Sequence, residues 1–406
     1  MKRVERIRLY PTSSQTARLN FMLHVTRRLY NALLQERRDA YRYRGIAISA
    51  KTQYAEITAL RHDDPGFAAV YRECQDAVLH RLDLAFAAFF RRLRRGETPG
   101  YPRFKAASRW EQLCFPHGAR ALKLDADQRR MCVPRVGMVR LRKGRSVPAF
   151  GQAWLVRRND RWYACFECER AVRPLPRNDR VVGVDRGVHV IAALDSGTLV
   201  RNIAIGERRK SATKRLQRRL DGVTVKDAAG HVLNRTDRAR IAAADRLARS
   251  RERERCARLD YLHKVARRIV NGAGVIALEA LNLRAMTRSA KGTAEAPGRN
   301  VRAKAGLNRR ILDASFGRLQ RLIVEKAEEA GRTVITVDPR FSSQTCSRCG
   351  HIAKESRRRR RFVCVGCGYA NHADVNAALV IRGRAQLALS REPHTGQQPV
   401  TLYDVA

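Results

Sequence analysis

Two pairs of cysteines near the carboxyl end of the sequence have the spacing of a metal site. Cys346 and Cys349 form one CxxC pair, Cys364 and Cys367 form the other, and a glycine directly follows each pair. Each pair can turn two thiolates toward one ion, and the fourteen intervening residues return the chain to complete a tetrahedron. With sulfur at all four positions, a bound zinc ion has no open site for water, so we expect structural zinc. The alternative is four unligated thiols.

Three acidic residues interrupt apolar segments that lie far apart in the sequence. Asp185 ends "VVGVD", Glu279 ends "VIALE", and Asp374 begins the helical stretch "ADVNAALVI". A charge in an apolar strand is costly unless something compensates it. Taken singly, each acid could be a helix cap or half of a salt bridge. Taken together, they offer the oxygen ligands that a divalent metal prefers, and two Mg²⁺ ions ~3.5 to 4 Å apart could hydrolyse a phosphodiester.

The charge balance of the chain points to a polyanionic partner. Lysine and arginine number 83 against 38 acidic residues, which gives a net charge of +45 at pH 7. Such a protein repels itself unless polyanions neutralise it, so we expect nucleic-acid binding. The alternative is arginine enrichment from codon bias, but codon bias does not remove acidic residues.

A run of five arginines lies in the segment between the two cysteine pairs. A charge run of this kind is usually a solvated face. On a metal-bound loop of so basic a protein we expect it to contact the phosphate backbone, without base specificity. The run comprises Arg357, Arg358, Arg359, Arg360 and Arg361.

Neither a membrane span nor a secretory signal is expected. No apolar run approaches the ~18 residues that a span needs, and "MKRVERIRLYP" lacks the apolar core of a signal peptide. We therefore expect a cytoplasmic protein. A further CxxC pair, Cys165 and Cys168, has no second pair nearby and lies in an alternating segment, so we interpret it as part of a strand.

The elements of the first half follow from periodicity. Residues 13–109 have apolar residues at helical spacing, and Thr12 with Gln15 forms a candidate capping box at their start. Residues 110–178 alternate as short strands, with a hairpin turn at Asn159 and Asp160. The segment 173–179 is a candidate linker.

The second half alternates strands and helices. We expect three strands joined by turns at Gly187 and at Ser196-Gly197, then a mostly basic helix over 207–270, with Ile241 among its apolar residues. The remaining elements are a buried strand at 274–283, a mobile loop at 287–306, an amphipathic helix at 307–331, a strand at 333–339 and a loose tail at 384–406.

Several motifs resemble those of a known family. "GVDRGV", "VIALEALNL", "SSQTCSRCG" and "CGYANHADVNAA" stand in the order and approximate spacing of the TnpB proteins of bacterial transposons, which also resemble the type V CRISPR nucleases. The similarity extends to "RLYPT", "LYNALL", "GYPRFK", "LDYLHK" and "LNRRILDASFGRL", so it covers most of the chain. It is weak over 206–236, and Ala280 stands where the family often has a second acid.

This resemblance implies an α/β multidomain fold. The expected parts are a RuvC-like nuclease domain of ribonuclease H fold, an inserted zinc ribbon, a helical recognition lobe and a small β-barrel wedge domain. Their expected bounds are 179–383 for the nuclease domain, 340–372 for the ribbon, 13–109 for the recognition lobe, and 1–12 with 110–178 for the wedge domain.

The resemblance also implies site residues and partners. Asp185, Glu279 and Asp374 would be the catalytic acids that bind Mg²⁺, while the four cysteines of the two pairs would bind Zn²⁺. The expected activity is RNA-guided cleavage of double-stranded DNA beside a short flanking motif, with one chain per guide RNA. Two alternatives are a guide-dependent DNA-binding protein that does not cut, and a transposase that joins DNA ends.

Overall fold

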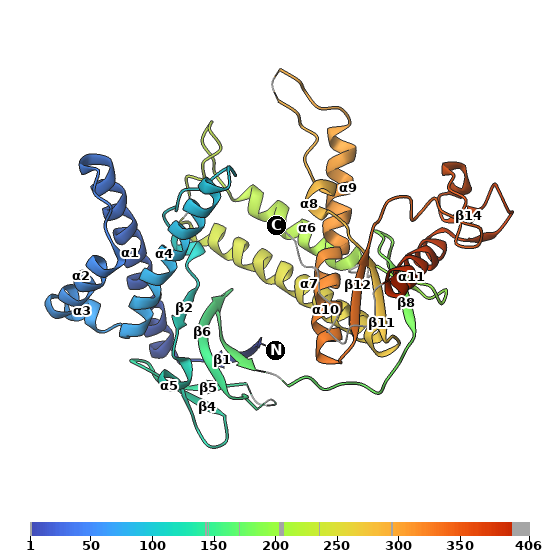
Figure 1. Ribbon diagram of the computed structural model, residues 1–406. Coiled ribbons are helices and arrows are strands. Elements are labelled where there is room, and N and C mark those ends of the chain that lie inside the picture. The colour runs from blue at the N-terminus through green and yellow to red at the C-terminus, as the bar shows by residue number, and fades with distance from the viewer. Residues whose placement is uncertain are drawn as a thin grey trace. The chain divides into compact units, whose positions relative to one another are not determined.

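The computed structural model describes residues 2–142, 144, 146–169, 171–202, 207–234, 236–293 and 295–391 (Figure 1). The chain divides into two compact units, Met1–Arg170 and Ala171–Ala406, and each is considered by itself. Among the described residues, no helix combines the length and the apolar character needed to cross a lipid bilayer.

Helices make up the first part of unit 1, as the periodicity predicts. They are α1 (Ser13–Arg44), α2 (Ala50–Asp63), α3 (Pro65–Ala68), α4 (Arg72–Arg94), the 3-10 turn η1 (Ala107–Arg109) and α5 (Gly118–Ala121). The capping box is confirmed, because Thr12 and Gln15 each bond the other's backbone N–H through a side-chain oxygen. After α4 the chain leaves the helix at Gly96, whose φ is +65°, and runs without helix to residue 106.

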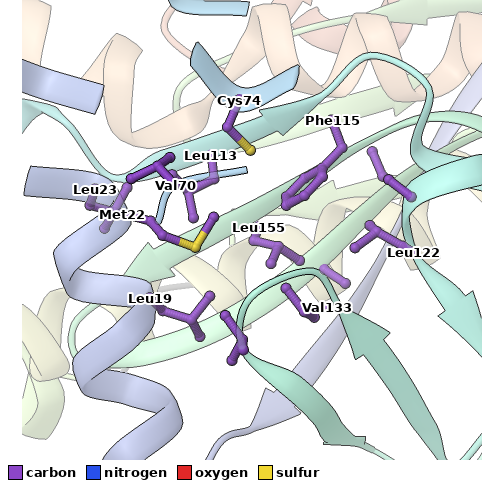
Figure 2. Close-up of a cluster of buried hydrophobic side chains, with 14 of the residues drawn as sticks. Leu19, Met22, Leu23, Val70, Cys74, Leu113, Phe115, Leu122, Val133 and Leu155 are labelled. Carbon is purple, nitrogen blue, oxygen red and sulfur yellow. The ribbon is translucent and has the colours of Figure 1, made fainter. Parts of the chain in front are cut away.

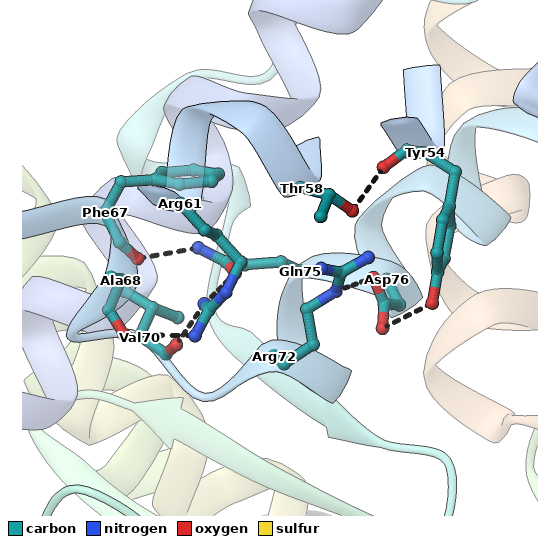
Figure 3. Close-up of polar contacts among 9 residues, drawn as sticks. All are labelled: Tyr54, Thr58, Arg61, Phe67, Ala68, Val70, Arg72, Gln75 and Asp76. Atoms are coloured by element: carbon teal, nitrogen blue, oxygen red, sulfur yellow. Dashed lines mark hydrogen bonds and ion pairs between the residues drawn. The ribbon is translucent and has the colours of Figure 1, made fainter. Parts of the chain in front are cut away.

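A polar network fixes the corner between α2 and α4 (Figure 3). The Arg61 guanidinium donates to the carbonyls of Val70, at 2.8 Å, and Ala68, at 3.2 Å. Gln75 contacts the same guanidinium and donates to the Phe67 carbonyl at 2.8 Å. These bonds give hydrogen-bond partners to backbone carbonyls of the short segment between α2 and α4. After this segment, α4 packs against α1.

One seven-stranded antiparallel sheet completes unit 1, in the order β2-β6-β7-β1-β5-β4-β3. The strands are β1 (Lys2–Tyr10), β2 (Gln112–Phe115), β3 (Lys123–Leu124), β4 (Arg130–Val133), β5 (Gly137–Leu141), β6 (Phe150–Arg158) and β7 (Arg161–Glu169). The turn at Asn159 and Asp160 is confirmed, since both have positive φ, as a two-residue hairpin requires. Cys165 and Cys168 lie on β7 opposite Arg6 and Arg3 of β1, so the strand interpretation of this CxxC is also confirmed.

The helices and the sheet of unit 1 share one core (Figure 2). Leu19 and Met22 of α1 lie against Leu113 of β2 and Leu155 of β6, and all four are almost completely buried. The N-terminal strand and the helices after it therefore fold with residues 110–169.

Unit 2 contains a five-stranded mixed sheet in the order β10-β9-β8-β11-β12. The strands are β8 (Val181–Asp185), β9 (Val190–Leu194), β10 (Leu199–Arg201), β11 (Val275–Glu279) and β12 (Thr333–Val337). β8, β11 and β12 are parallel, whereas β9 and β10 form the antiparallel meander that the sequence predicts. The carboxyl ends of β8 and β11 therefore lie side by side.

The expected helix over 207–270 is two helices, α6 (Glu207–Gly222) and α7 (Arg238–Asn271). A turn held by Asn234, which donates to the Val223 carbonyl at 2.8 Å, separates them, and Asp237 caps the start of α7. Ile241 was expected on the apolar side of the helix, but it is exposed because it lies in the first turn after this break.

The expected single helix at 307–331 is also divided. α9 (Val301–Ala314) begins inside the expected loop, and α10 (Phe316–Glu329) follows a break at Ser315, whose φ is +55°. In a straight helix Phe316 would point roughly 140° away from Ile311. The break lets both residues be buried. A short helix, α8 (Leu283–Met286), follows β11.

The last helix crosses the sheet of unit 2. α11 (Ala373–Arg391) packs against β8, and it extends the ordered chain through 384–391, which the sequence analysis placed in the loose tail. That assignment is wrong because Ala385 belongs to the buried core with Ala277 and Ile381. Residues 392–406 lie outside the described residues.

A glycine on β8 allows the backbone of α11 to lie close to the strand. A Cβ atom on Gly183 of β8 would lie 2.0 Å from the carbonyl oxygen of Ala378 and 2.8 Å from the amide nitrogen of Arg382. Both atoms belong to the backbone of α11 and cannot rotate away, so only glycine allows this approach.

We predict that Gly183→Ala destabilises unit 2 by about 3 kcal/mol or more, because the helix must move off the strand. The midpoint of thermal or urea unfolding measures this effect. Gly306→Ala is the matched control: it adds the same methyl group where nothing lies within 4 Å, inside helix α9. That substitution should stabilise the protein by about 0.5 to 1 kcal/mol. Equal stability of the two variants would contradict the role given to Gly183.

Candidate active site and metal centre

The four cysteines of the two CxxC pairs converge on one point. Their sulfur atoms all lie within 4.8 Å of one another, with 3.8 Å between Cys346 and Cys367 and 3.6 Å between Cys349 and Cys364. Zinc–sulfur bonds of about 2.3 Å in a tetrahedron require sulfur atoms about 3.8 Å apart. The donors therefore fit a tetrahedral metal ion, and this is the only such group in the described part of the chain.

The backbone turns prepare the thiols for a metal. The N–H of Gly350 donates to the Cys346 carbonyl at 3.0 Å, and that of Gly368 donates to the Cys364 carbonyl at 2.9 Å. Both glycines have positive φ, which closes the turns. At Cys364, burial raises the pKa, but the backbone N–H groups of Cys367 and Gly366 outweigh it and lower the pKa to about 6. This favours the thiolate, the form that binds metals.

A three-stranded sheet joins the cysteine cluster to helix α11. Its strands are β13 (Arg357–Arg358), β14 (Arg361–Val363) and β15 (Ala370–His372), and β15 runs directly into the helix. Asn376, which is completely buried, accepts from Ser347 N–H at 3.0 Å and donates to the Thr345 carbonyl at 2.8 Å. The first cysteine turn is thus bonded to the first turns of α11.

The three sequence-predicted acids lie on neighbouring elements of unit 2, but among the described residues only the four cysteines have ligand atoms within 4.8 Å of one another. Asp185 is the last residue of β8 and Glu279 the last of β11, and these strands pair in parallel with Leu278 opposite Val184. Asp374 lies in the first turn of α11, the helix that packs on β8.

The charges of the other two acids act on Asp185. The pKa of Asp185 is raised to about 7, first by burial and then by the charges of Glu279 and Asp374, while Arg357 and Arg186 oppose the rise. Three carboxylates gathered in a partly desolvated site repel one another, and a divalent cation relieves that repulsion.

Each of the two flanking acids has a fixed partner. The Ser342 hydroxyl donates to Glu279 Oε1 at 2.5 Å, and both side chains are buried. Arg357 Nη2 donates to Asp374 Oδ1 at 2.9 Å. The orientation of both carboxylates is therefore set before any ligand binds.

A buried arginine directly follows Asp185 in the sequence and bonds the backbone of Glu279. Arg186 is only 4% exposed, and it donates to the main-chain carbonyl of Glu279 and to Gln320 Oε1, the latter at 2.7 Å. Its positive charge offsets part of the carboxylate charge. Sequence reasoning missed Arg186, Ser342 and Asn376. Ser342 lies inside the quoted "SSQTCSRCG" motif, and Arg186 directly follows Asp185, so adjacency to a motif was the available signal.

The arginine run divides into two groups. Arg357 turns toward Asp374 and is half-buried, whereas Arg358, Arg359, Arg360 and Arg361 are exposed on the small sheet. Four of the five side chains are therefore open to solvent, while Arg357 is bonded to a carboxylate.

Three family profiles match the chain. Residues 1–45 match a helix-turn-helix domain profile (HTH_OrfB_IS605), residues 163–290 match a probable transposase profile (OrfB_IS605), and residues 316–381 match the Cas12f1-like TNB domain. The last of these covers the cysteine cluster and Asp374.

Two curated proteins are similar over most of the chain. "Putative RNA-guided DNA endonuclease InsQ" of Escherichia coli K12 is 33% identical over 79% of this chain and 76% of its own length. A protein of Streptomyces pristinaespiralis with the same description is 26% identical over 93% of this chain and 88% of its own. Among solved structures, the mini-RNA-guided endonuclease CRISPR-Cas_phi3 aligns with 97% of this chain and 93% of its own, at 10% identity and a TM-score of 0.49.

The pKa of Asp185 predicts a pH-dependent stability in magnesium-free buffer. The unfolded chain releases this proton near pH 3.8, whereas the folded protein keeps it until about pH 7. The unfolded state binds fewer protons in this window, so stability should fall as the pH rises through it.

The variant Asp185→Asn cannot ionise at this position. Its free energy of unfolding should therefore exceed that of the wild type by roughly 2 to 4 kcal/mol near pH 8. Urea unfolding at several pH values measures this, with Asp63→Asn, an exposed acid, as control. An unchanged slope in Asp185→Asn would contradict it.

Asn376 should control how the cysteine cluster is held against α11. Asn376→Ala leaves the Ser347 N–H and the Thr345 carbonyl without a partner, at a cost of roughly 1 to 3 kcal/mol. Hydrogen exchange should quicken in residues 345–352 while the bound metal content stays normal, because no sulfur is changed. Ser390→Ala, near the other end of the same helix, is the control and should change neither quantity. Loss of the metal in Asn376→Ala would show that the cluster itself depends on this contact.

Proposed function

The chain belongs to the TnpB family, and we propose that it is an RNA-guided DNA endonuclease of a transposable element. It cleaves DNA complementary to a bound guide RNA, next to a short flanking motif, by metal-dependent phosphodiester hydrolysis. One observation supports the proposal: Asp185 and Glu279 end the adjacent strands β8 and β11, and the charges of Glu279 and Asp374 both act on Asp185, in a chain whose relatives are named as RNA-guided DNA endonucleases.

The three carboxylates are the catalytic residues of this proposal. Mg²⁺ held by them would supply the Lewis acidity and the activated water that hydrolysis needs. Ser342 orients Glu279, and the N-terminus of α11 holds Asp374. Arg357, now bonded to Asp374, is within reach of a phosphate placed on the acids, and its positive charge would stabilise the anion there. Arg186 stays buried and fixes the end of β11 through the Glu279 carbonyl.

The cysteine cluster holds a structural zinc ion in this proposal. Four sulfur donors leave no coordination position for water, so the ion takes no part in hydrolysis. Its contribution is mechanical, because the first cysteine turn is bonded through Asn376 to the helix that carries Asp374.

Each unit then has a role. Residues 179–383 form a RuvC-like nuclease domain of ribonuclease H fold, with a zinc ribbon at 340–372; the mixed five-stranded sheet supports this assignment. Residues 13–109 are a helical recognition lobe, and residues 1–12 with 110–178 are a β-barrel wedge domain, supported by the single sheet that joins these two segments. Nucleic acid is gripped through its backbone and base pairing supplies the specificity. The protein works in the bacterial cytoplasm, one chain per guide RNA.

The direct test is to purify the protein with its bound RNA and sequence that RNA. We expect one species with a constant scaffold and a variable end, and cleavage in Mg²⁺ of a plasmid that matches the variable end. Random RNA fragments would overturn the proposal. Target occupancy without nicking would favour a DNA-binding role, and joined DNA ends would favour a transposase.

Mutations should distinguish the role of the zinc ion from that of Mg²⁺. Asp374→Ala should reduce cleavage at least about 1,000-fold, because a metal ligand is lost, while the zinc content stays normal. Cys364→Ser should lower the zinc content and reduce cleavage by misplacing Asp374. Zinc analysis and a cleavage assay on the same preparations measure both effects. Equal zinc loss in the two variants would refute this division of roles.

A further inference from the structure

The sequence concentrates aromatic residues in one segment of unit 1. The chain has 26 aromatic residues, from 12 Phe, 11 Tyr and 3 Trp, and five of them lie within residues 86–104. They are Phe86, Phe89 and Phe90 of α4, and Tyr101 and Phe104 of the loop that follows it. We call these five residues the aromatic cluster.

Four rings of the aromatic cluster form a closed set of contacts. Tyr101 lies edge-on to Phe86, with ring centroids 5.6 Å apart, and to Phe89, at 5.4 Å. Phe90 contacts the same two phenylalanines at 6.4 and 5.2 Å. Only Phe86 packs against the buried core of unit 1. Phe90, Tyr101 and Phe104 are 51%, 42% and 44% exposed.

Cations surround these rings. Residues 84–105 contain six lysines and arginines and a single acid, Glu97. From α1, the Arg37 guanidinium lies 5.3 Å from the centre of the Phe86 ring, and that of Arg38 lies 5.2 Å from the centre of Phe104. Each of these two arginines also pairs with an acid, Arg37 with Asp83 at 2.7 Å and Arg38 with Asp39 at 3.5 Å. Burial, and then the charges of Arg81, Arg109 and Arg103, lower the pKa of Lys105.

The loop that carries Tyr101 and Phe104 is anchored. Asn31 of α1 accepts from Lys105 N–H at 2.8 Å and donates to the Lys105 carbonyl at 3.1 Å. A fixed scaffold therefore presents the exposed rings, so a ligand that stacks on them meets a surface that is already formed.

From this surface we infer a binding site for unpaired nucleobases of the guide RNA. Exposed aromatic rings among arginines match a single strand, whose bases stack on the rings while its phosphates meet the cations. A duplex offers only its backbone, because its bases are already stacked. A second protein chain with a surface of like charge would be repelled.

The guide RNA, not the displaced DNA strand, is the occupant. The inference rests on the proposed function here, because only there is an RNA the resident partner. An apolar surface open to solvent in the resting protein favours aggregation and needs a permanent cover. The guide is bound throughout, whereas displaced DNA is present only during target recognition.

The test removes the rings but keeps apolar side chains. A triple variant, Phe90→Leu with Tyr101→Leu and Phe104→Leu, should bind a single-stranded RNA of about 12 nucleotides about 10- to 100-fold more weakly than the wild type. Its affinity for the same strand annealed to its complement should not change. Phe21→Leu is the matched control, because Phe21 is also 44% exposed, on α1 outside the aromatic cluster.

Chemical probing of the co-purified RNA identifies the source of the strand. Unpaired guide nucleotides that the wild type protects should become reactive in the triple variant. Unchanged RNA reactivity, with lost protection of displaced DNA in a target complex, would overturn the inference. So would an equal loss of duplex binding, or a change in oligomeric state alone.

Two further measurements distinguish a failure of this inference from unfolding of the triple variant and from a failure of the proposed function. If the triple variant unfolds, the single variant Phe104→Leu carries the same prediction with a smaller loss, and unaltered RNA reactivity in it would overturn the inference. If the wild type fails to cleave guided DNA but RNA protection depends on the rings, the nuclease proposal fails and this surface stands.

Discussion

The close crossing of α11 over β8 is the constraint on which the site depends. Gly183 lets the helix backbone lie against the strand, which places Asp374 beside the carboxyl ends of β8 and β11. Without this approach, Asp185 and Glu279 would still be neighbours, because parallel pairing puts their strands side by side. In the proposed site the third carboxylate reaches them only through this helix, so Gly183 would determine whether the acid set is complete.

The cysteine cluster is bonded to the first turns of the same helix through Asn376. It lies between β12 and α11 in the sequence, and without it that segment would be a long connection with few internal contacts. The four clustered thiols, Phe362 in a small core and the two bonds of Asn376 hold the segment together. Ser342 extends this support to Glu279. In the proposed nuclease, the zinc site and the hydrolytic site would thus be parts of one arrangement, although their ligands are of different chemical kinds.

Sequence patterns predicted the elements that local chemistry determines. The CxxC pairs, the capping box at Thr12, the hairpin at Asn159-Asp160 and the meander of unit 2 depend on short-range geometry. The patterns failed where tertiary packing decided: the break at Ser315 buries both Ile311 and Phe316, and Ala385 draws residues 384–391 into a helix. The partners of the acids were missed because Ser342 and Glu279 are 63 residues apart, and no periodicity connects them.

The central claim is that three carboxylates from distant segments bind divalent metal as one set. Titration of the zinc-loaded protein with Mn²⁺, followed by its paramagnetic resonance signal, tests this directly. The wild type should bind Mn²⁺ at the acid site. Replacing Asp185, Glu279 or Asp374 by alanine should each weaken that binding strongly, with the zinc retained. Mn²⁺ binding that survives the loss of any one of the three acids would contradict the account.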